Sequence, residues 1–332
     1  MAQMTHAEAV AAYTGGLAPD AVPPFEGSER LRPDGRPRPE FRAELRVIPN
    51  LRNAGLCVVA AIYPFVAIGA AVQIDHPLVW IAAFFVMGAY FQRAATLFHE
   101  AAHRLLFSNR TLNDWVGERV FGWLPFGTGE NGYRLSHSQH HRDEFGEKEP
   151  DFLLYANYPI SRASLRRKLV RDAVGISGWK NLKPTIVGFT KPGRRTRALR
   201  FWGAQAVVFA TFVLFGHPWL YLFLWFLPWM TYWRVANRLR ALAEHAGMTR
   251  SDDRRHTTHH IRQGFLAKHV FLSQSIGFHL AHHVDSGIPM ANLPTLQRAL
   301  EEDGYVDATI THDGYWAFWR SLARSGETTA SA

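Results

Sequence analysis

The stretch "GLCVVAAIYPFVAIGAAVQI" at residues 55–74 decides the fold class. It carries no charge and has about the length of one membrane-spanning helix. After the polar break "DHP" at 75–77, a second apolar stretch at 78–91 continues through Gln92 and Arg93 into a histidine-bearing segment. The two stretches therefore predict a helical hairpin that crosses a bilayer.

A second apolar pair predicts a second hairpin. Residues 201–215 and 219–233 are separated only by Gly216-His217-Pro218, and glycine and proline break a helix as a tight turn requires. Buried core helices of a soluble enzyme are the alternative, but 55–74 and 219–233 are apolar on every face rather than amphipathic. We expect four membrane spans in two hairpins.

Basic residues indicate which side of the membrane the loops occupy. The net charge is +9, and residues 161–200 are rich in Arg and Lys and nearly free of acidic residues. Nucleic-acid binding is one explanation of such a run. Beside membrane spans the positive-inside rule is the commoner one, so we expect a cytoplasmic segment and no nucleic-acid partner. The run can also lie along an anionic membrane surface, or hold an acidic headgroup or an acidic electron carrier.

Composition outlines the domains. Residues 1–48 are polar and Pro-rich and lack a signal-peptide pattern, so they are expected to form a cytoplasmic tail. Residues 49–310 are expected to form the membrane domain, and 311–332 a C-terminal tail. The single cysteine, Cys57, excludes disulfides, Cys-type zinc sites and Cys-ligated iron–sulfur clusters.

Three histidine clusters mark the functional site. They are "HEAAH" at 99–103, "HSQHH" at 137–141 and "HLAHH" at 279–283. On a helix, positions i, i+3 and i+4 share one face, so the imidazoles of each cluster are expected to converge on one point. Imidazole suits Zn, Cu, Fe and Ni alike. Eight histidines plus His245 exceed the three or four ligands of one zinc, so the sequence predicts two metal ions, all on the cytoplasmic side.

The three clusters, in this order around two hairpins, resemble the histidine boxes of the membrane fatty acid desaturase and hydroxylase superfamily. The resemblance extends to "YRLSHSQHH", "AEHAG" and "GIPMANLPTLQRAL" and covers roughly residues 50–305. It implies an all-α integral membrane protein, with four transmembrane helices in two hairpins and a cytoplasmic helical cap holding a histidine-ligated di-iron site. The N-terminus, the boxes and the C-terminus would all be cytoplasmic. The ligands implied are His99, His103, His137, His140, His141, His245, His279, His282 and His283.

The resemblance also implies an activity. It is a fatty acid desaturase that uses O2 as co-substrate and acts on a long-chain acyl lipid or acyl-thioester among membrane lipids. The sequence carries no haem-binding or cysteine-rich domain, so electrons are expected from a separate ferredoxin, rubredoxin or cytochrome b5 type donor. One alternative is a hydroxylase or monooxygenase of a lipid, alkane or terpenoid on the same scaffold. Others are a membrane zinc metalloprotease with Glu100 of HEAAH as general base, and a non-catalytic metal carrier.

Some positions depart from the family pattern or imitate it. Ala241 stands where acyl-CoA members have Asn, and "EKEPDF" at 147–152 stands where many members have Asp-Pro-Asp. The cluster His256-Thr-Thr-His259-His260 has the box spacing, but it is expected to be a solvated or substrate-edge loop outside the ligand set. Glu100 is expected to lie behind the ligands or to face solvent.

Overall fold

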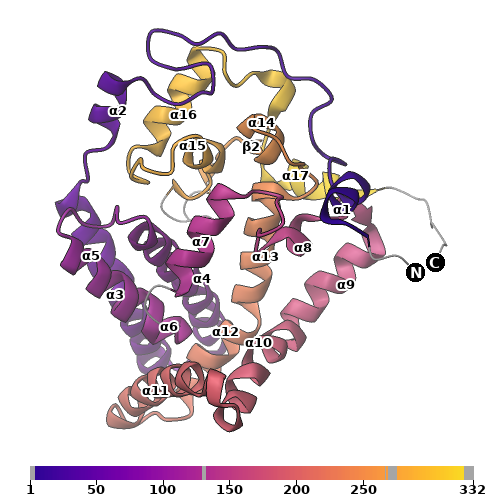
Figure 1. The fold of residues 1–332 in the computed structure, drawn as a ribbon. Helices are drawn as coiled ribbons and strands as arrows, with labels where there is room; N and C mark the ends of the chain where they lie inside the picture. The colour runs from indigo at the N-terminus through magenta and orange to yellow at the C-terminus, as the bar shows by residue number, and fades with distance from the viewer. Residues whose placement is uncertain (1–3, 129–131, 266, 268–274, 325–332) are drawn as a thin grey trace. The chain divides into compact units, whose positions relative to one another are not determined.

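The computed structural model describes residues 4–128, 132–265, 267 and 275–324 (Figure 1). Within these residues the chain is mostly helical and divides into two compact units. Unit 1 comprises Met1–Val47, Leu135–Lys168 and Arg238–Ala332, and unit 2 comprises Ile48–Arg134 and Leu169–Asn237. The chain passes from one unit to the other within three helices, which are α7 (Gly132–Arg142), α9 (Arg162–Ala173) and α13 (Tyr232–His245).

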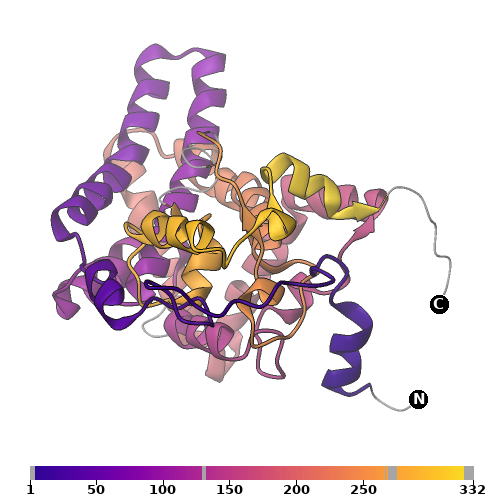
Figure 2. The ribbon, with the colours of Figure 1, turned by 90° about the horizontal axis from the view of Figure 1, so that it is seen from above.

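Unit 2 begins with the predicted hairpin. Helices α3 (Asn50–Ile74) and α4 (Pro77–Ala102) lie side by side (Figures 1 and 2). Asp75 makes the turn in the left-handed region at φ 44°, and the His76 side chain accepts the Leu78 N–H to cap α4. Among the described residues, these two helices are the ones long and apolar enough to cross a membrane. The predicted continuation of the second stretch into HEAAH is confirmed, because α4 runs unbroken to Ala102.

The second apolar pair folds differently from the prediction. Helix α11 (Pro192–Leu214) starts nine residues before the predicted 201–215, because proline suits a first helical position and arginine is a good helix former. The segment 219–233 is divided among the π-helix η3 (Tyr221–Phe226), α12 (Leu227–Met230) and the start of α13. The predicted turn at Gly216 is present, with φ 78°.

Unit 2 is completed by short elements that pack on α4 or on α11. Its remaining elements are α5 (Arg110–Trp115), the π-helix η1 (Val116–Trp123), α6 (Leu124–Phe126), α10 (Ile176–Val187) and the 3-10 turn η2 (Gly188–Thr190). Gly88 lets the Tyr232 ring pack directly against the backbone of α4, since a Cβ at this position would lie 1.9 Å from the Cδ1 atom of Tyr232. Tyr90 and Phe91 of α4 pack on Trp225 with ring centroids 5.5 and 5.1 Å away. An aromatic core therefore fixes α4 within this unit.

Unit 1 is built of short helices and two small parallel sheets. The sheets pair β1 (Ile160–Ser161) with β4 (Ala323–Arg324), and β2 (His260–Ile261) with β3 (Thr311–His312). The helices, besides the parts of α7, α9 and α13 that belong here, are α1 (His6–Tyr13), α2 (Pro39–Leu45), α8 (Phe152–Tyr155), α14 (Arg254–Thr257), α15 (His279–Val284), α16 (Leu293–Glu302), the 3-10 turn η6 (Ala308–Ile310) and α17 (Tyr315–Ser321).

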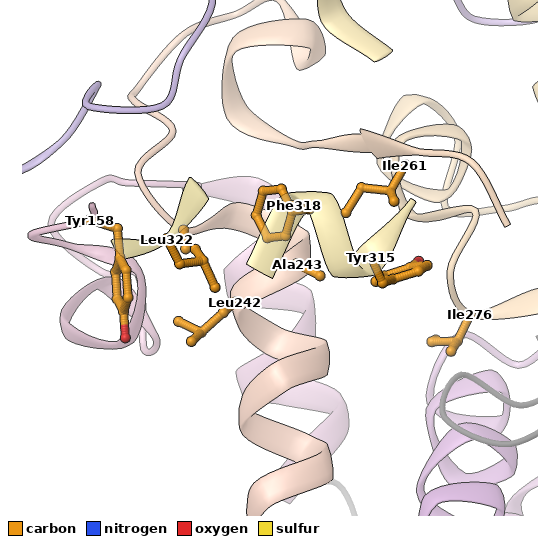
Figure 3. Close-up of a cluster of buried hydrophobic side chains, with 9 residues drawn as sticks. Tyr158, Leu242, Ala243, Ile261, Ile276, Tyr315, Phe318 and Leu322 are labelled. Atoms are coloured by element: carbon orange, nitrogen blue, oxygen red, sulfur yellow. The ribbon is translucent and has the colours of Figure 1, made fainter. Parts of the chain in front are cut away.

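The core of unit 1 holds the end of α13. Leu242 and Ala243 of α13 are buried with Phe318 and Leu322 from the C-terminal segment (Figure 3). On another side of the helix, Ala241 packs in a second buried cluster with Phe145, Tyr155 and Met248. These two clusters fix the last turn of α13, which ends at His245.

The segments predicted as tails, 1–48 and 311–332, contribute packed structure where they are described. Leu31 is fully buried, and Thr5 and Glu8 form a capping box at the start of α1. Thr311 pairs with His260, and Phe318 is fully buried. A few well-spaced apolar residues thus anchor these mostly polar segments, and their assignment as tails stays a prediction. The assignment of 49–310 as the membrane domain stays a prediction.

Candidate metal centre

Four buried histidines of unit 1 form one group of possible metal ligands in the described structure. They are His140 on α7, His245 at the end of α13, and His279 and His283 on α15. One ring nitrogen of each lies within 4.8 Å of one ring nitrogen of every other. The sequence separates these residues by up to 143 positions, so only the fold of unit 1 brings them together.

Hydrogen bonds on the outer nitrogens fix how the rings face. The Nδ1 atom of His245 donates to the Thr257 carbonyl at 2.7 Å, that of His283 donates to Glu144 at 2.5 Å, and that of His140 donates to Glu149 at 3.0 Å. Since carbonyl and carboxylate oxygens only accept, each Nδ1 carries a proton, and in the neutral ring the Nε2 atom keeps its lone pair. Metal-binding histidines are held in this way by carboxylates and carbonyls behind them.

The inner nitrogens lack suitable protein partners. The Nε2 atoms of His245 and His279 face each other at 3.1 Å, and the buried Nε2 of His283 has no hydrogen-bond partner among the described residues. A buried lone pair without a donor is costly, and a cation at the centre of the four rings would satisfy it. The donor set therefore fits a metal ion that prefers imidazole nitrogen, such as iron, zinc, copper or nickel.

The electrostatic environment suits neutral imidazole ligands. Burial places the pKa values of His245, His279 and His283 well below the ordinary histidine value. For His140, burial also lowers the pKa, but the hydrogen bond and charge of Glu149 outweigh burial and leave the pKa raised. Metal binding at His140 therefore displaces a proton that the other three rings do not hold.

Two arginines support the carboxylates behind this group. Arg254 pairs with Glu144 at 2.5 Å, and Arg240 pairs with Glu244 at 2.5 Å. Glu244 lies 3.6 Å from the Nδ1 atom of His279. Burial raises the pKa values of both carboxyl groups, and the arginines act in the opposite direction. Glu144 thus lies between His283 and Arg254. Glu244 likewise lies between His279 and Arg240.

A second histidine group in unit 1 is smaller. The Nε2 atom of His141 lies 3.1 Å from the Nε2 atoms of both His137 and His282. The rings of His137 and His282 are nearly parallel, at an interplanar angle of 8°. Three ring nitrogens therefore converge here, and further ligands are needed to complete a metal site.

The two H-x-x-H-H boxes divide between these groups. In each box the i and i+4 histidines point to one group and the i+3 histidine points to the other: His140 leaves His137 and His141, and His282 leaves His279 and His283. The prediction that the three rings of a box converge on one point is wrong. Positions i and i+3 differ by about 60° around a helix, which suffices to aim them at different points when facing helices supply the other ligands.

HEAAH lies in unit 2, at the C-terminal end of α4. The rings of His99 and His103 are 4.8 Å apart, as spacing i and i+4 predicts. Asn113 and Arg134 donate to the carbonyls of Ala101 and Ala102 and thereby satisfy the exposed end of the helix. Glu100 is 2 % exposed, so of its two expected positions, facing solvent is excluded and lying behind the ligands remains.

The box-like cluster His256, His259 and His260 belongs to no histidine group among the described residues. His259 binds the Ala246 carbonyl through Nε2 at 2.8 Å, and His260 contacts Thr311 and Glu301, both at 3.0 Å. His259 and His260 are buried, so this segment is not the solvated loop that the sequence suggested. It supports the centre instead, since the Thr257 carbonyl within it holds His245.

The acidic residues behind the rings are not among the residues predicted from the sequence. Glu144, Glu149 and Glu244 each lie within nine residues of a box or of His245, and this proximity was an available signal. The departure "EKEPDF" contains Glu149 itself, so this chain keeps a carboxylate there. Ala241 contributes no metal ligand and packs in a buried hydrophobic cluster.

Comparison with known proteins adds an independent finding. A family model described as fatty acid desaturase matches residues 75–314. The chain is 26% identical to a dihydrorhizobitoxine desaturase of Bradyrhizobium elkanii, over 86% of this chain and 81% of that protein. It is 24% identical to an sn-1 oleoyl-lipid 12-desaturase of Arthrospira platensis (77% and 74% covered) and 25% identical to a chloroplastic omega-6 fatty acid desaturase of Spinacia oleracea (68% and 54% covered).

Proposed function

We propose that this chain, which belongs to the fatty acid desaturase family, introduces a double bond into the acyl chain of a membrane lipid with two iron ions held by nine histidines. The chain is an oxidoreductase of the desaturase type. The reaction removes two hydrogens from adjacent methylenes, consumes O2, two electrons and two protons, and releases two waters. We assign the electrons to a separate ferredoxin, rubredoxin or cytochrome b5 type protein.

The four buried histidines carry this proposal. His140, His245, His279 and His283 present lone pairs to one point while hydrogen bonds, or in His279 a nearby carboxylate, occupy their outer nitrogens. We assign them to one iron. When bound, iron supplies the one-electron redox chemistry and O2 activation that no side chain provides.

We assign the second iron to His137, His141 and His282 together with the pair on α4. The three converging nitrogens of unit 1 fall short of a full ligand set, and His99 and His103 form the remaining box with ligand spacing. The role of the protein around both irons is to hold the rings. Glu144, Glu149 and the Thr257 carbonyl keep each proton on Nδ1, and burial keeps water from competing for Nε2.

We also propose four spans, with the histidines and both termini in the cytoplasm. The two long apolar helices support the first hairpin. Apolar side chains exposed on α3, such as Phe65 (58 %) and Val66 (64 %), suit contact with lipid chains. α11 and η3 expose similar side chains, including Val213 and Phe223, which supports a second hairpin. The basic run at 161–200 orients both hairpins by the positive-inside rule.

An acyl lipid is the substrate we favour. Two of the three relatives above are named for fatty acyl substrates, and one is named for dihydrorhizobitoxine. The apolar surface of α3 supports a position in the membrane, where acyl lipids are concentrated.

Lipid profiling of cells that express the chain tests the proposal. We expect an acyl species two mass units lighter than its precursor with the wild type, none with His279→Ala, and two irons per purified chain. A product heavier by one oxygen would replace desaturation by hydroxylation. One zinc per chain with Glu100-dependent peptidase activity would overturn the proposal altogether.

A further inference from the structure

A pocket in unit 2 contains a partly buried cation, Arg234. The cavity has a volume of about 140 Å³ and is lined by residues from the end of α6 and from α10, α11, α12 and α13. The Arg234 guanidinium lies between two of its walls, 4.1 Å from the Trp229 ring centroid and 4.3 Å from the Trp233 ring centroid. This stacking covers the faces of the guanidinium and leaves its N–H edge for other partners.

Hydrogen-bond donors on the lining residues are unsatisfied. The Nε and Nη2 atoms of Arg234, the indole nitrogens of Trp229 and Trp233, and the Thr128 hydroxyl are buried without a hydrogen-bond partner among the described residues. Guanidinium and indole N–H groups can only donate. Buried donors normally have partners, so several unpaired donors on one cavity indicate a missing acceptor.

The charge around the pocket indicates that the acceptor is an anion. Arg197 of α11 supplies a second cation to the lining, and none of the lining residues that the structure describes is acidic. The sequence has no Asp or Glu between Asp172 and Glu244, whereas residues 176–200 contain seven Lys and Arg. Asp172 acts on Arg234 through its charge but lies outside the lining and accepts no hydrogen bond from its Nε or Nη2.

The shape of the donors indicates an oxyanion. A guanidinium edge matches the two oxygens of a carboxylate or phosphate, and indole and hydroxyl groups can bind further oxygens. Phe126 and Phe201 add apolar walls beside these donors. At roughly 30 Å³ per water, the cavity holds about five waters, enough for one anionic head but not for a whole lipid.

We propose that this pocket binds the carboxylate or phosphate head of an acyl lipid, with Arg234 as the main contact and Arg197 as the second. That the bound head belongs to the substrate rests on the proposed function. The link is α13, which carries Arg234 and ends in the proposed ligand His245. The capacity of the pocket to bind an anionic head does not depend on iron or on turnover.

Native mass spectrometry of the full chain in a neutral detergent tests the pocket. The probes are phosphatidic acid, oleate, uncharged diacylglycerol and inorganic phosphate. We expect phosphatidic acid or oleate to bind at least about tenfold more tightly than diacylglycerol, since charge-assisted hydrogen bonds strengthen binding by this order. Equal binding of diacylglycerol would overturn the proposal. Inorganic phosphate that competes at concentrations equal to those of phosphatidic acid would reassign the pocket to free phosphate and overturn the lipid assignment.

Matched variants locate the binding. Arg234→Gln should weaken anionic-lipid binding about tenfold or more, Arg234→Lys should restore part of it, and Arg195→Gln, an exposed position on α11 outside the lining, should change it less than twofold. Arg197→Gln, whose residue is exposed, repeats the test without disturbing a buried site. Wild-type affinity in both Arg234→Gln and Arg197→Gln refutes the proposal. The His137→Ala variant should bind lipid as the wild type does, so failure of catalysis and failure of this pocket are separable.

Discussion

Replacing Glu149 with alanine should weaken iron binding at the group of four buried histidines that contains His140, without unfolding unit 1. Both Glu149 oxygens lie 3.0 Å from the Nδ1 atom of His140, and the two side chains are 1 % and 5 % exposed, respectively. Without the carboxylate, His140 loses the partner that fixes its tautomer and ring orientation. Changes of this kind cost about 10–100-fold in metal affinity, or about 1.4–2.8 kcal/mol.

The measurement is iron retained by purified protein against increasing chelator at pH 8, where proton competition at His140 contributes least. We expect the half-point for loss of one iron per chain to fall about 10–100-fold in Glu149→Ala. Glu149→Gln should fall less, because its amide oxygen still accepts from His140 and from the Asp151 N–H. Glu147→Ala is the control, since Glu147 is exposed two residues away. If Glu149→Ala and Glu147→Ala release iron at the same chelator concentration, the proposed role of the carboxylate is wrong.

Three further predictions follow from the packing of unit 1. Phe318→Ala should destabilise the protein by about 3–5 kcal/mol because Phe318 is fully buried. The control is Trp316→Ala, which should change stability by less than about 1 kcal/mol because Trp316 is 70 % exposed. Thermal unfolding in detergent compares the two variants, and equal melting temperatures would contradict this core. Burial lowers the pKa of His259 to about 3, so the folded state resists protonation of this ring. The free energy of unfolding should therefore fall as the pH drops below the unfolded pKa near 6.5, by about 2 kcal/mol at pH 5 from this residue. His259→Gln should remove that share of the loss, and an unchanged dependence of stability on pH would refute this prediction. His256→Ala and His260→Gln should keep both irons in metal analysis, since these residues lie outside the histidine groups of the described structure, and loss of an iron would return the cluster to the ligand set.

The first hairpin was predictable because its signal is local. Residues 55–74 are uniformly apolar, the break at 75–77 ends in proline, and α4 then continues to the end of HEAAH. The second pair was less predictable, since hydropathy marks where a chain is apolar and not where a helix begins or ends. α11 extends into a basic segment, and 219–233 changes helix type around Pro228 although every part of it is apolar.

The composition of the site was also visible in the sequence, but its division between two groups was not. Box spacing shows which rings share a face of one helix, whereas the point that each ring reaches depends on the opposite helix. His245 shows this in unit 1: it comes from α13, its Nε2 atom lies 3.1 Å from that of His279, and its ring meets the His140 ring edge to face with centroids 4.9 Å apart. Its position depends on Leu242 and Ala243 in the core and on the Thr257 carbonyl, none of which carries a metal-binding signature.

The split of each box has a consequence for how the two histidine groups are coupled. Because α7 and α15 each contribute to both groups, neither group can shift without carrying ligands of the other along on the same rigid turn of helix. The carboxylates hold the same two helices, because Glu149 binds His140 of α7 and Glu144 binds His283 of α15. Both of these histidines belong to the first group. The second group, with His137, His141 and His282, is then positioned largely by the first. Unit 1 therefore holds His137, His141 and His282 in place through the order of the first group.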